Sequence, residues 1–190
     1  NEDKCKNDEN CEYVRPPATM HTPPYWQKVF SMKDVLKTKD CTYAMYIDSD
    51  AVLNTSVRNL RPINKSILVT TDPRPDLHAM NAGVFIVKND ERGNAFLHDW
   101  TQIYENKVHA HWKKSITKKW HCVENNKACK WGGSMYEQGA VKPLLNKYKD
   151  DIVTVPWQEW NDYRCPEHSS AKVCHFMGNN KKNINSFLNG

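Results

Sequence analysis

Two aspartates separated by one serine, Asp48 and Asp50, end an apolar run that begins at Tyr43. The run predicts a buried strand, and side chains at positions i and i+2 of a strand point the same way. Carboxylates placed together repel each other unless a cation lies between them. Hard divalent cations such as Mn²⁺ and Mg²⁺ favour oxygen ligands and keep open positions for phosphate oxygens. The pair therefore predicts a metal site, with a solvated Asp/Ser turn as the alternative.

A histidine near the end of the last predicted strand is the candidate third ligand. His175 follows Val173 and Cys174, and neutral imidazole beside two carboxylates suits Mn²⁺. Taken alone, a strand histidine is more often a hydrogen-bonded core residue. The segment that follows contains Lys181 and Lys182, whose ammonium groups could clamp a diphosphate beside the metal or lie in a solvated tail.

Further polar residues could contact a sugar. Glu137 could be a general base for a hydroxyl, could face a developing sugar cation, or could only stabilise the first turn of a short helix. Gln138 would then be a neutral contact on the reacting face of the sugar. Asn81, before a strand, could bind sugar hydroxyls or belong to an ordinary turn. The aromatic segment 157–163 could form an acceptor platform or pack in the core.

These residues need a framework that holds them, and the chain alternates buried strands with helices. Besides the strand that begins at Tyr43, apolar segments predict strands at 66–71, 81–88, 151–156 and 172–177. Helical periodicity is found at 25–37, 89–106 and 136–145, whereas 107–133 has no regular pattern. The alternation predicts an α/β fold with a mainly parallel central sheet flanked by helices. Ligands of such sheets bind at the carboxyl ends of the strands, where Asp48 and Asp50 fall.

Composition limits the classes of function. The 190 residues suit one domain with a core of its own. The net charge of +5 suits anionic ligands, but no basic patch interleaved with stacking aromatics predicts nucleic-acid binding. No run approaches the roughly 18 apolar residues of a membrane span, and no signal-peptide pattern opens the chain. The densest basic group is expected on a solvated face or loop and comprises Lys113, Lys114, Lys118 and Lys119.

Seven cysteines are widely spaced and contain no C-x-x-C pair, so a zinc ribbon or a thioredoxin-like site is not expected. The pairs Cys122/Cys129 and Cys165/Cys174 could be disulfides in a secretory lumen or free thiols in a cytosol.

Taken in order, these segments resemble a GT-A glycosyltransferase. The resemblance covers residues 20–182 and points to the retaining galactosyl- and mannosyltransferases of fungal and plant Golgi, a family that includes the plant xyloglucan xylosyltransferases. The sequence is also similar to the small amino-terminal glycosyltransferase domain of a chlorovirus capsid-glycosylating protein. The matching segments are Tyr25-Trp-Gln-Lys, Tyr46-Ile-Asp-Ser-Asp-Ala, Asn81-Ala-Gly-Val-Phe, Glu137-Gln138, 157–163 and His175-Phe-Met-Gly178.

The resemblance implies a fold, an activity and residue roles. Residues 1–190 would form one GT-A domain that starts after the family's first nucleotide-binding strand. Mn²⁺, or Mg²⁺, would be held by Asp48, Asp50 and His175, and Glu137 and Gln138 would occupy the catalytic positions. The donor would be a nucleotide diphosphate sugar, a UDP-sugar in the first place. Its contacts would be Asp48, Ser49, Asn81, Lys181 and Lys182, although the two lysines lie near, and not at, the position of the family's diphosphate-binding lysine.

The resemblance further implies transfer of a hexose or deoxyhexose to a hydroxyl of a glycan or glycoprotein acceptor. The viral relative implies a host cytoplasm and the plant and fungal relatives a Golgi lumen, with a monomer or one domain of a larger protein in either case. A carbohydrate-binding module on a degenerate transferase fold is the alternative, but it need not keep Asp48, Asp50 and His175. A metal-dependent phosphohydrolase is a third hypothesis, which the segment after Asp50 fits poorly.

Overall fold

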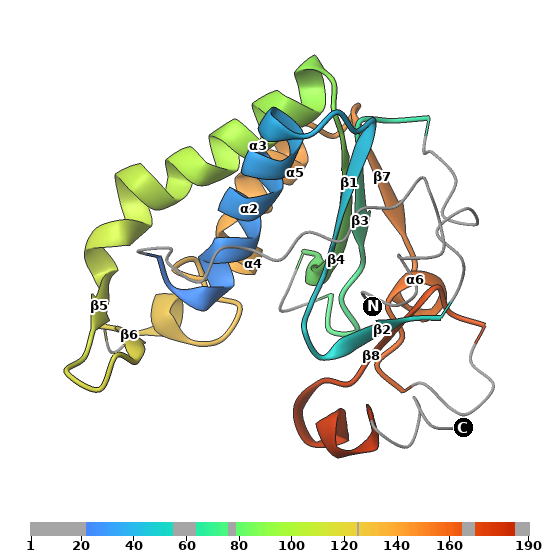
Figure 1. The fold of residues 1–190 in the computed structure, drawn as a ribbon. Helices are drawn as coiled ribbons and strands as arrows, with labels where there is room; N and C mark the ends of the chain where they lie inside the picture. Colours follow the sequence, from blue (N-terminus) through green and yellow to red (C-terminus); the bar gives the residue numbers. More distant parts are fainter. Residues whose placement is uncertain (1–21, 55–63, 76–78, 125, 165–169, 185–190) are drawn as a thin grey trace.

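A four-stranded sheet forms the centre of the molecule (Figure 1). The computed structural model describes residues 22–54, 64–75, 79–124, 126–164 and 170–184. Within these ranges β4 pairs antiparallel with both β1 and β3, and β3 pairs parallel with β7. The strands, in spatial order, are β1 (Tyr43–Ile47), β4 (Asn81–Lys88), β3 (Ile67–Thr70) and β7 (Ile152–Val155).

The α/β class is confirmed, but the expectation of a mainly parallel sheet is wrong for the described strands. It rested on the alternation of buried strands with helices, in which the near-continuous apolar runs are typical of strands covered on both faces. Seven of the eight residues of β4 are buried. Such a run therefore reports burial on both faces and carries no information about strand direction.

Helices cover one face of this sheet (Figure 1). Their apolar sides meet the sheet in the main core, where Trp26, Phe85 and Trp100 are fully buried. Asp90 begins one of them, because its side chain accepts the Gly93 N–H at 2.9 Å. The helices are α2 (Pro24–Thr38), α3 (Glu91–Ile103), α4 (Glu137–Ala140) and α5 (Lys142–Lys147).

The other face of the sheet packs against a second, two-stranded sheet of β2 (Ala51–Leu53) and β8 (Val173–His175). A small apolar cluster of Val84 with residues of β2 and β8 joins the two sheets. The short helix α6 (Trp157–Trp160) precedes β8, and the 3₁₀ segment η5 (Gly178–Asn183) follows it. The chain therefore passes from the first sheet to the second between β1 and β2, where the two aspartates lie.

Residues 107–133, predicted to be irregular, contain a hairpin. The π-helical segment η2 (Tyr104–Val108) and the turn η3 (His109–His111) lead from α3 into it, and η4 (Lys127–Cys129) follows. The strands β5 (Trp112–Lys114) and β6 (Trp120–Cys122) form the hairpin itself. A disulfide joins Cys122 to Cys129, and Cys174 is also disulfide-bonded, whereas Cys165 lies outside the described residues.

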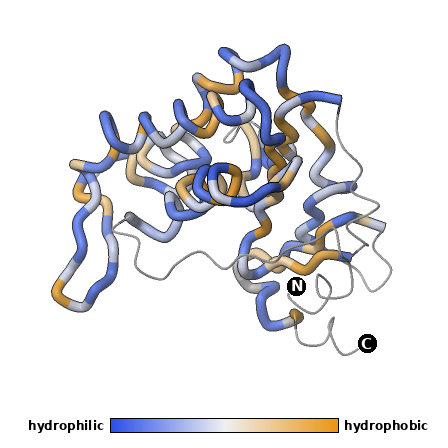
Figure 2. The backbone as a smooth tube through the Cα atoms, turned by 45° about the horizontal axis from the view of Figure 1, so that its top comes forward, coloured by the Kyte–Doolittle hydropathy of each residue, from blue (hydrophilic) through white to orange (hydrophobic). Residues whose placement is uncertain are grey.

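Hydropathy follows this architecture. Apolar segments run through the packed centre, and the hairpin extends away from it as a mostly hydrophilic loop (Figure 2). Among the described residues, no helix combines the length and the apolar character that crossing a membrane would require.

Candidate metal centre

A tight turn brings Asp48 and Asp50 together. The Ala51 N–H donates to the Asp48 carbonyl at 3.0 Å, which closes a β-turn over Ser49. The first sheet holds one end of the turn, because Asp48 N–H donates to Gly83 O at 2.9 Å. Strand alternation predicted that the carboxylates lie together, but a turn between two sheets produces this arrangement.

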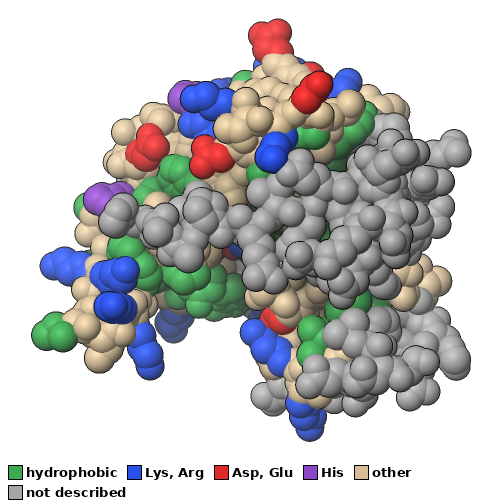
Figure 3. Space-filling view, in the orientation of Figure 1, with side chains coloured by type: hydrophobic (Ala, Val, Ile, Leu, Met, Phe, Trp, Pro, Cys, Tyr) green, Lys and Arg blue, Asp and Glu red, His purple; other side chains and the backbone are tan. Residues whose placement is uncertain are grey.

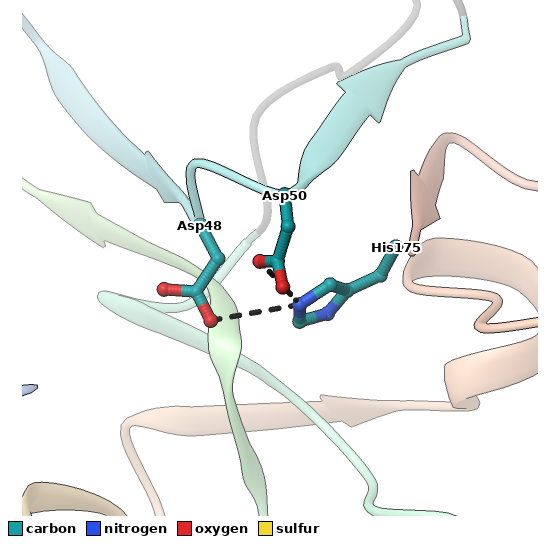
Figure 4. Close-up of side chains that lie close together, drawn as sticks. All are labelled: Asp48, Asp50 and His175. Atoms are coloured by element: carbon teal, nitrogen blue, oxygen red, sulfur yellow. Dashed lines mark hydrogen bonds and ion pairs between the residues drawn. The ribbon is translucent and has the colours of Figure 1, made fainter. Parts of the chain in front are cut away.

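His175 completes a three-residue group (Figure 4). Its Nε2 lies 3.2 Å from Asp50 Oδ1 and 3.6 Å from Asp48 Oδ2. The three potential ligand atoms lie within 4.8 Å of one another, and no other such group occurs among the described residues. The imidazole is buried, whereas the carboxylates keep side-chain exposures of 24% and 19%. The group can therefore hold an ion and leave part of its surface open.

A chain of amide hydrogen bonds determines which nitrogen of His175 carries the proton. The Gly83 N–H can only donate, so the atom of Asn81 that it contacts at 2.9 Å must be Oδ1. Asn161 contacts this same oxygen at 2.9 Å and must present its NH₂ group there. Asn161 Oδ1 consequently faces His175 Nδ1 at 3.0 Å, and Nδ1 is the protonated nitrogen.

It follows that neutral His175 directs the lone pair of Nε2 toward Asp48 and Asp50. A lone pair and two carboxylates repel one another unless a cation lies between them. Histidines that ligate metals typically donate their other N–H to such a partner, and two carboxylates with one imidazole suit Mn²⁺ or Mg²⁺. The donor set and its support therefore fit a divalent ion.

The imidazole also requires a glycine beneath it. A Cβ built on Gly83 would lie 2.4 Å from His175 Cε1 and 2.8 Å from Asn81 Oδ1. Any larger residue at this position would displace the ring or the amide that orients it.

A buried lysine supports Asp48 from behind. Lys28 of α2 is 6% exposed, and its Nζ lies 2.9 Å from Asp48 Oδ1 and 3.2 Å from Glu137 Oε1. Tyr46 also donates to Asp48 Oδ1 at 2.9 Å. Burial opposes the charge on Lys28, but Glu137 and Asp48 outweigh it and raise the pKa of the lysine. Lys28 therefore stays cationic between Asp48 and Glu137.

A second lysine lies at the open side of the group. Lys181 Nζ contacts Asp50 Oδ2 at 2.9 Å, and the lysine side chain is 62% exposed. Burial opposes ionisation of Asp50, but the contact with the Lys181 ammonium holds the pKa of its carboxyl well below the usual range. Lys182 is exposed beside Lys181.

The other predicted site residues lie near this group but deeper. Glu137 is 1% exposed and Gln138 is 5% exposed. Gln138 accepts the Ala82 N–H at 3.0 Å and donates to Asp72 at 3.4 Å. Asn81 is 4% exposed. The catalytic roles expected of Glu137 and Gln138 and the sugar contact expected of Asn81 stay predictions.

Ser49 is exposed at the apex of the turn. Figure 3 shows a hollow beside the turn, between the arm that ends in β5 and β6 and the part that carries β2 and β8.

Three residues of this network were missed in the sequence. Lys28 lies on the apolar side of an amphipathic helix, where a lysine at a core position is the signal that could have identified it. Asp72 is 3% exposed and accepts from Asn81 Nδ2 at 3.1 Å, but Asp-Pro is a common turn signal. Asn161 lies among aromatic residues, and nothing in its neighbourhood pointed to His175.

No family model and no curated protein matches this sequence. Solved structures do match its fold. One is a glycosyltransferase involved in the glycosylation of the major capsid of PBCV-1, with a TM-score of 0.61 and 13% identity over 93% of this chain and 83% of the other. The chain has a glycosyltransferase fold.

Two further matches are structures of the glycosyltransferase GlyE of Streptococcus pneumoniae TIGR4. The apo form aligns with a TM-score of 0.52 and 12% identity, and the other structure with 0.50 and 13%. Both alignments cover 89% of this chain but only 39% and 40% of GlyE, so the chain spans about two-fifths of that protein. At these identities the matches establish the fold alone.

Proposed function

We propose that the chain is a metal-dependent glycosyltransferase, which moves a sugar from a nucleotide diphosphate sugar to a hydroxyl of a glycan or glycoprotein. The observation that carries the proposal is the Asp48, Asp50 and His175 group, with the Nε2 lone pair directed at two carboxylates, within a glycosyltransferase fold. A UDP-sugar is the proposed donor, and a hexose or deoxyhexose the transferred unit.

The roles of the chain's own residues follow from their contacts. Asp48, Asp50 and His175 would hold Mn²⁺ or Mg²⁺, which acts as a Lewis acid on a leaving diphosphate. Lys28 fixes Asp48 in position. Lys181 is exposed and contacts the open side of Asp50, so its ammonium can also meet a phosphate oxygen.

The proposal does not require Glu137 to accept the proton of the acceptor hydroxyl. Its Oε1 is paired with Lys28, and its Oε2 is buried without a hydrogen-bond partner among the described residues. Burial raises the pKa of Glu137, although the charge of Lys28 opposes this effect. In this position its carboxylate acts on the site through Lys28.

Thermal unfolding with a panel of nucleotide diphosphate sugars, each with and without Mn²⁺, tests the proposal. A ligand at 100 times its Kd stabilises the folded state by about 2.7 kcal/mol, so the true donor stands out in the presence of metal. Asp50→Asn should remove the metal-dependent shift and the transfer activity. Asp34→Asn, at an exposed carboxylate of α2, is the matched control and should change neither.

Two results would contradict the proposal. Unchanged Mn²⁺-dependent transfer in Asp50→Asn would refute the metal assignment. Binding of a glycan without any metal-dependent response to nucleotides would favour the carbohydrate-binding module instead.

A further inference from the structure

The hairpin of β5 and β6, residues 112–122, is a basic surface that the proposed transferase site does not use; we call it the basic hairpin. No acidic residue occurs between Glu105 and Glu124. Within the described part of the chain, none of the lysines of the hairpin forms an ion pair with a carboxylate. All four of them are exposed, namely Lys113, Lys114, Lys118 and Lys119.

The apex of the basic hairpin is apolar. Ser115 N–H donates to Lys119 O at 2.8 Å, and Lys118 N–H donates to Ser115 O at 2.9 Å, which closes a short loop. Ile116 lies within this loop and is 104% exposed, more than any other large apolar residue of the described chain. Figure 2 shows an apolar position at the end of a hydrophilic loop, and Figure 3 shows lysine side chains around a hydrophobic tip.

The loop keeps a lysine where the backbone favours glycine. Lys118 has a φ of 61°, in the left-handed region, and is the only non-glycine residue with positive φ in the described chain. Three-residue hairpin loops place such a residue before the second strand, usually glycine or asparagine. A lysine here adds a charge beside Ile116, although the left-handed backbone conformation is unfavourable for a residue with a side chain.

The base of the basic hairpin is held firmly. Trp112 is 5% exposed and its Nε1–H donates to Met135 O at 2.9 Å. The disulfide from Cys122 to Cys129 ties the second strand to the segment that follows. The exposed tip is therefore presented on a fixed support, away from the packed centre of the molecule (Figure 1).

We propose that the basic hairpin docks the protein onto an anionic lipid surface. Ile116 enters the boundary between headgroups and acyl chains, and the lysines on both arms contact lipid phosphates. An apolar apex surrounded by cations matches the layered chemistry of such a surface, because apolar and electrostatic contributions add. The proposal rests on these contacts alone and holds whether or not the chain is a transferase.

A nucleic acid fits the same surface less well. Binding of single strands needs exposed aromatic faces on which bases stack. Trp112 is buried, and the Lys114 ammonium lies 5.8 Å from the centroid of the Trp120 ring, over its face. An exposed isoleucine at the apex contributes nothing to contacts with phosphates.

Co-sedimentation with vesicles tests this proposal on the complete chain. Vesicles of phosphatidylcholine with roughly 30% phosphatidylserine, an anionic lipid, are compared with vesicles of pure phosphatidylcholine at low and high salt. Binding to the anionic vesicles alone, weakened by salt, is expected. Each lysine contributes about fivefold in affinity, so Lys113→Gln with Lys118→Gln should weaken binding about 25-fold. Ile116→Ser should weaken it about tenfold.

Two variants distinguish a loss of lipid docking from a loss of folding and from a general loss of positive charge. Lys118→Gly favours the left-handed backbone, so it should stabilise the loop and still weaken vesicle binding about fivefold. Lys142→Gln with Lys149→Gln removes two exposed charges elsewhere and should leave vesicle binding within twofold of wild type.

Absence of binding to the anionic vesicles at low salt would overturn the proposal. It would also be overturned if Lys142→Gln with Lys149→Gln weakened vesicle binding as much as Lys113→Gln with Lys118→Gln. Duplex and single-stranded RNA are tested in parallel. Tighter binding to either RNA, together with unchanged vesicle binding in Ile116→Ser, would assign the surface to nucleic acid and refute the lipid assignment.

Discussion

Asn161 should control the affinity of the candidate metal centre although it contacts no metal. Its Oδ1 accepts the Nδ1–H of His175 at 3.0 Å, and it is 1% exposed. In Asn161→Ala, a metal-bound His175 would bury an unsatisfied N–H, which costs about 1–3 kcal/mol. The imidazole would otherwise adopt the other tautomer and donate to Asp50, which occupies the nitrogen that the metal needs.

This cost converts to a loss of about 5- to 150-fold in Mn²⁺ affinity, in agreement with the roughly 10- to 100-fold effects of removing such partners. Electron paramagnetic resonance of free Mn²⁺ during a titration measures the affinity directly. Asn161→Asp retains the acceptor for Nδ1–H but loses the donor to Asn81 Oδ1, so its affinity should fall less than that of Asn161→Ala. Thr101→Val, at a buried threonine of α3 far from the site, controls for general loss of stability.

An affinity within twofold of wild type in Asn161→Ala would refute the reasoning, provided that the variant is folded. Equal losses in Asn161→Ala and Thr101→Val would also refute it, because the effect would then follow stability and not the orientation of His175.

Two further predictions concern stability. Lys28→Met leaves Glu137 as an unpaired buried carboxylate and should lower the free energy of unfolding, measured by urea denaturation, by about 3–5 kcal/mol. The double variant Lys28→Met with Glu137→Gln should recover a large part of this loss. Burial opposes ionisation of Asp90, but hydrogen bonds from Gly93 N–H and from Ser66 and Lys88 prevail and lower its pKa. The stability that Asp90 contributes is thus present above its unfolded pKa of roughly 3.9 and is lost as pH falls below it. Asp90→Asn keeps a capping side chain, so its urea midpoint should fall less between pH 5 and pH 3 than that of wild type; an identical fall would contradict the assignment.

Much of the candidate site could be predicted because its chemistry is local in the sequence. Asp48 and Asp50 are two residues apart, and an apolar strand marks His175. The reason given for their proximity was nevertheless different from the one observed, since a turn between two sheets places them. Periodicity locates buried segments, but it does not show where a run such as Tyr43 to Leu53 changes sheet.

The supporting network could not be predicted, because each member depends on a contact across the fold. Lys28, Asp72 and Asn161 come from a helix, the segment after β3 and the residue after a short helix. Their side chains become informative only when tertiary structure shows which atoms are already bonded. The direction of the strands was predicted wrongly for a related reason, since β4 is buried on both faces whether its neighbours run parallel or antiparallel to it.

The charges around the centre make metal and donor binding interdependent. Asp48, Asp50 and Glu137 contribute three negative charges, and Lys28 and Lys181 contribute two positive ones, a sum of −1 with neutral His175. The site as it stands therefore repels a diphosphate. One divalent cation changes the sum to +1, so the same site attracts the diphosphate once it is loaded.

Nucleoside diphosphates should consequently bind at least about tenfold more tightly with Mn²⁺ than without it, which corresponds to about 1.4 kcal/mol. Isothermal titration of UDP into the protein, with Mn²⁺ or with a chelator, measures the difference. Lys181→Gln lowers both sums by one charge and should weaken UDP binding in the loaded state. Equal UDP affinity with and without metal would show that the diphosphate lies elsewhere. An anionic diphosphate bound beside Asp48 and Asp50 must bind more tightly when a cation lies between the two carboxylates.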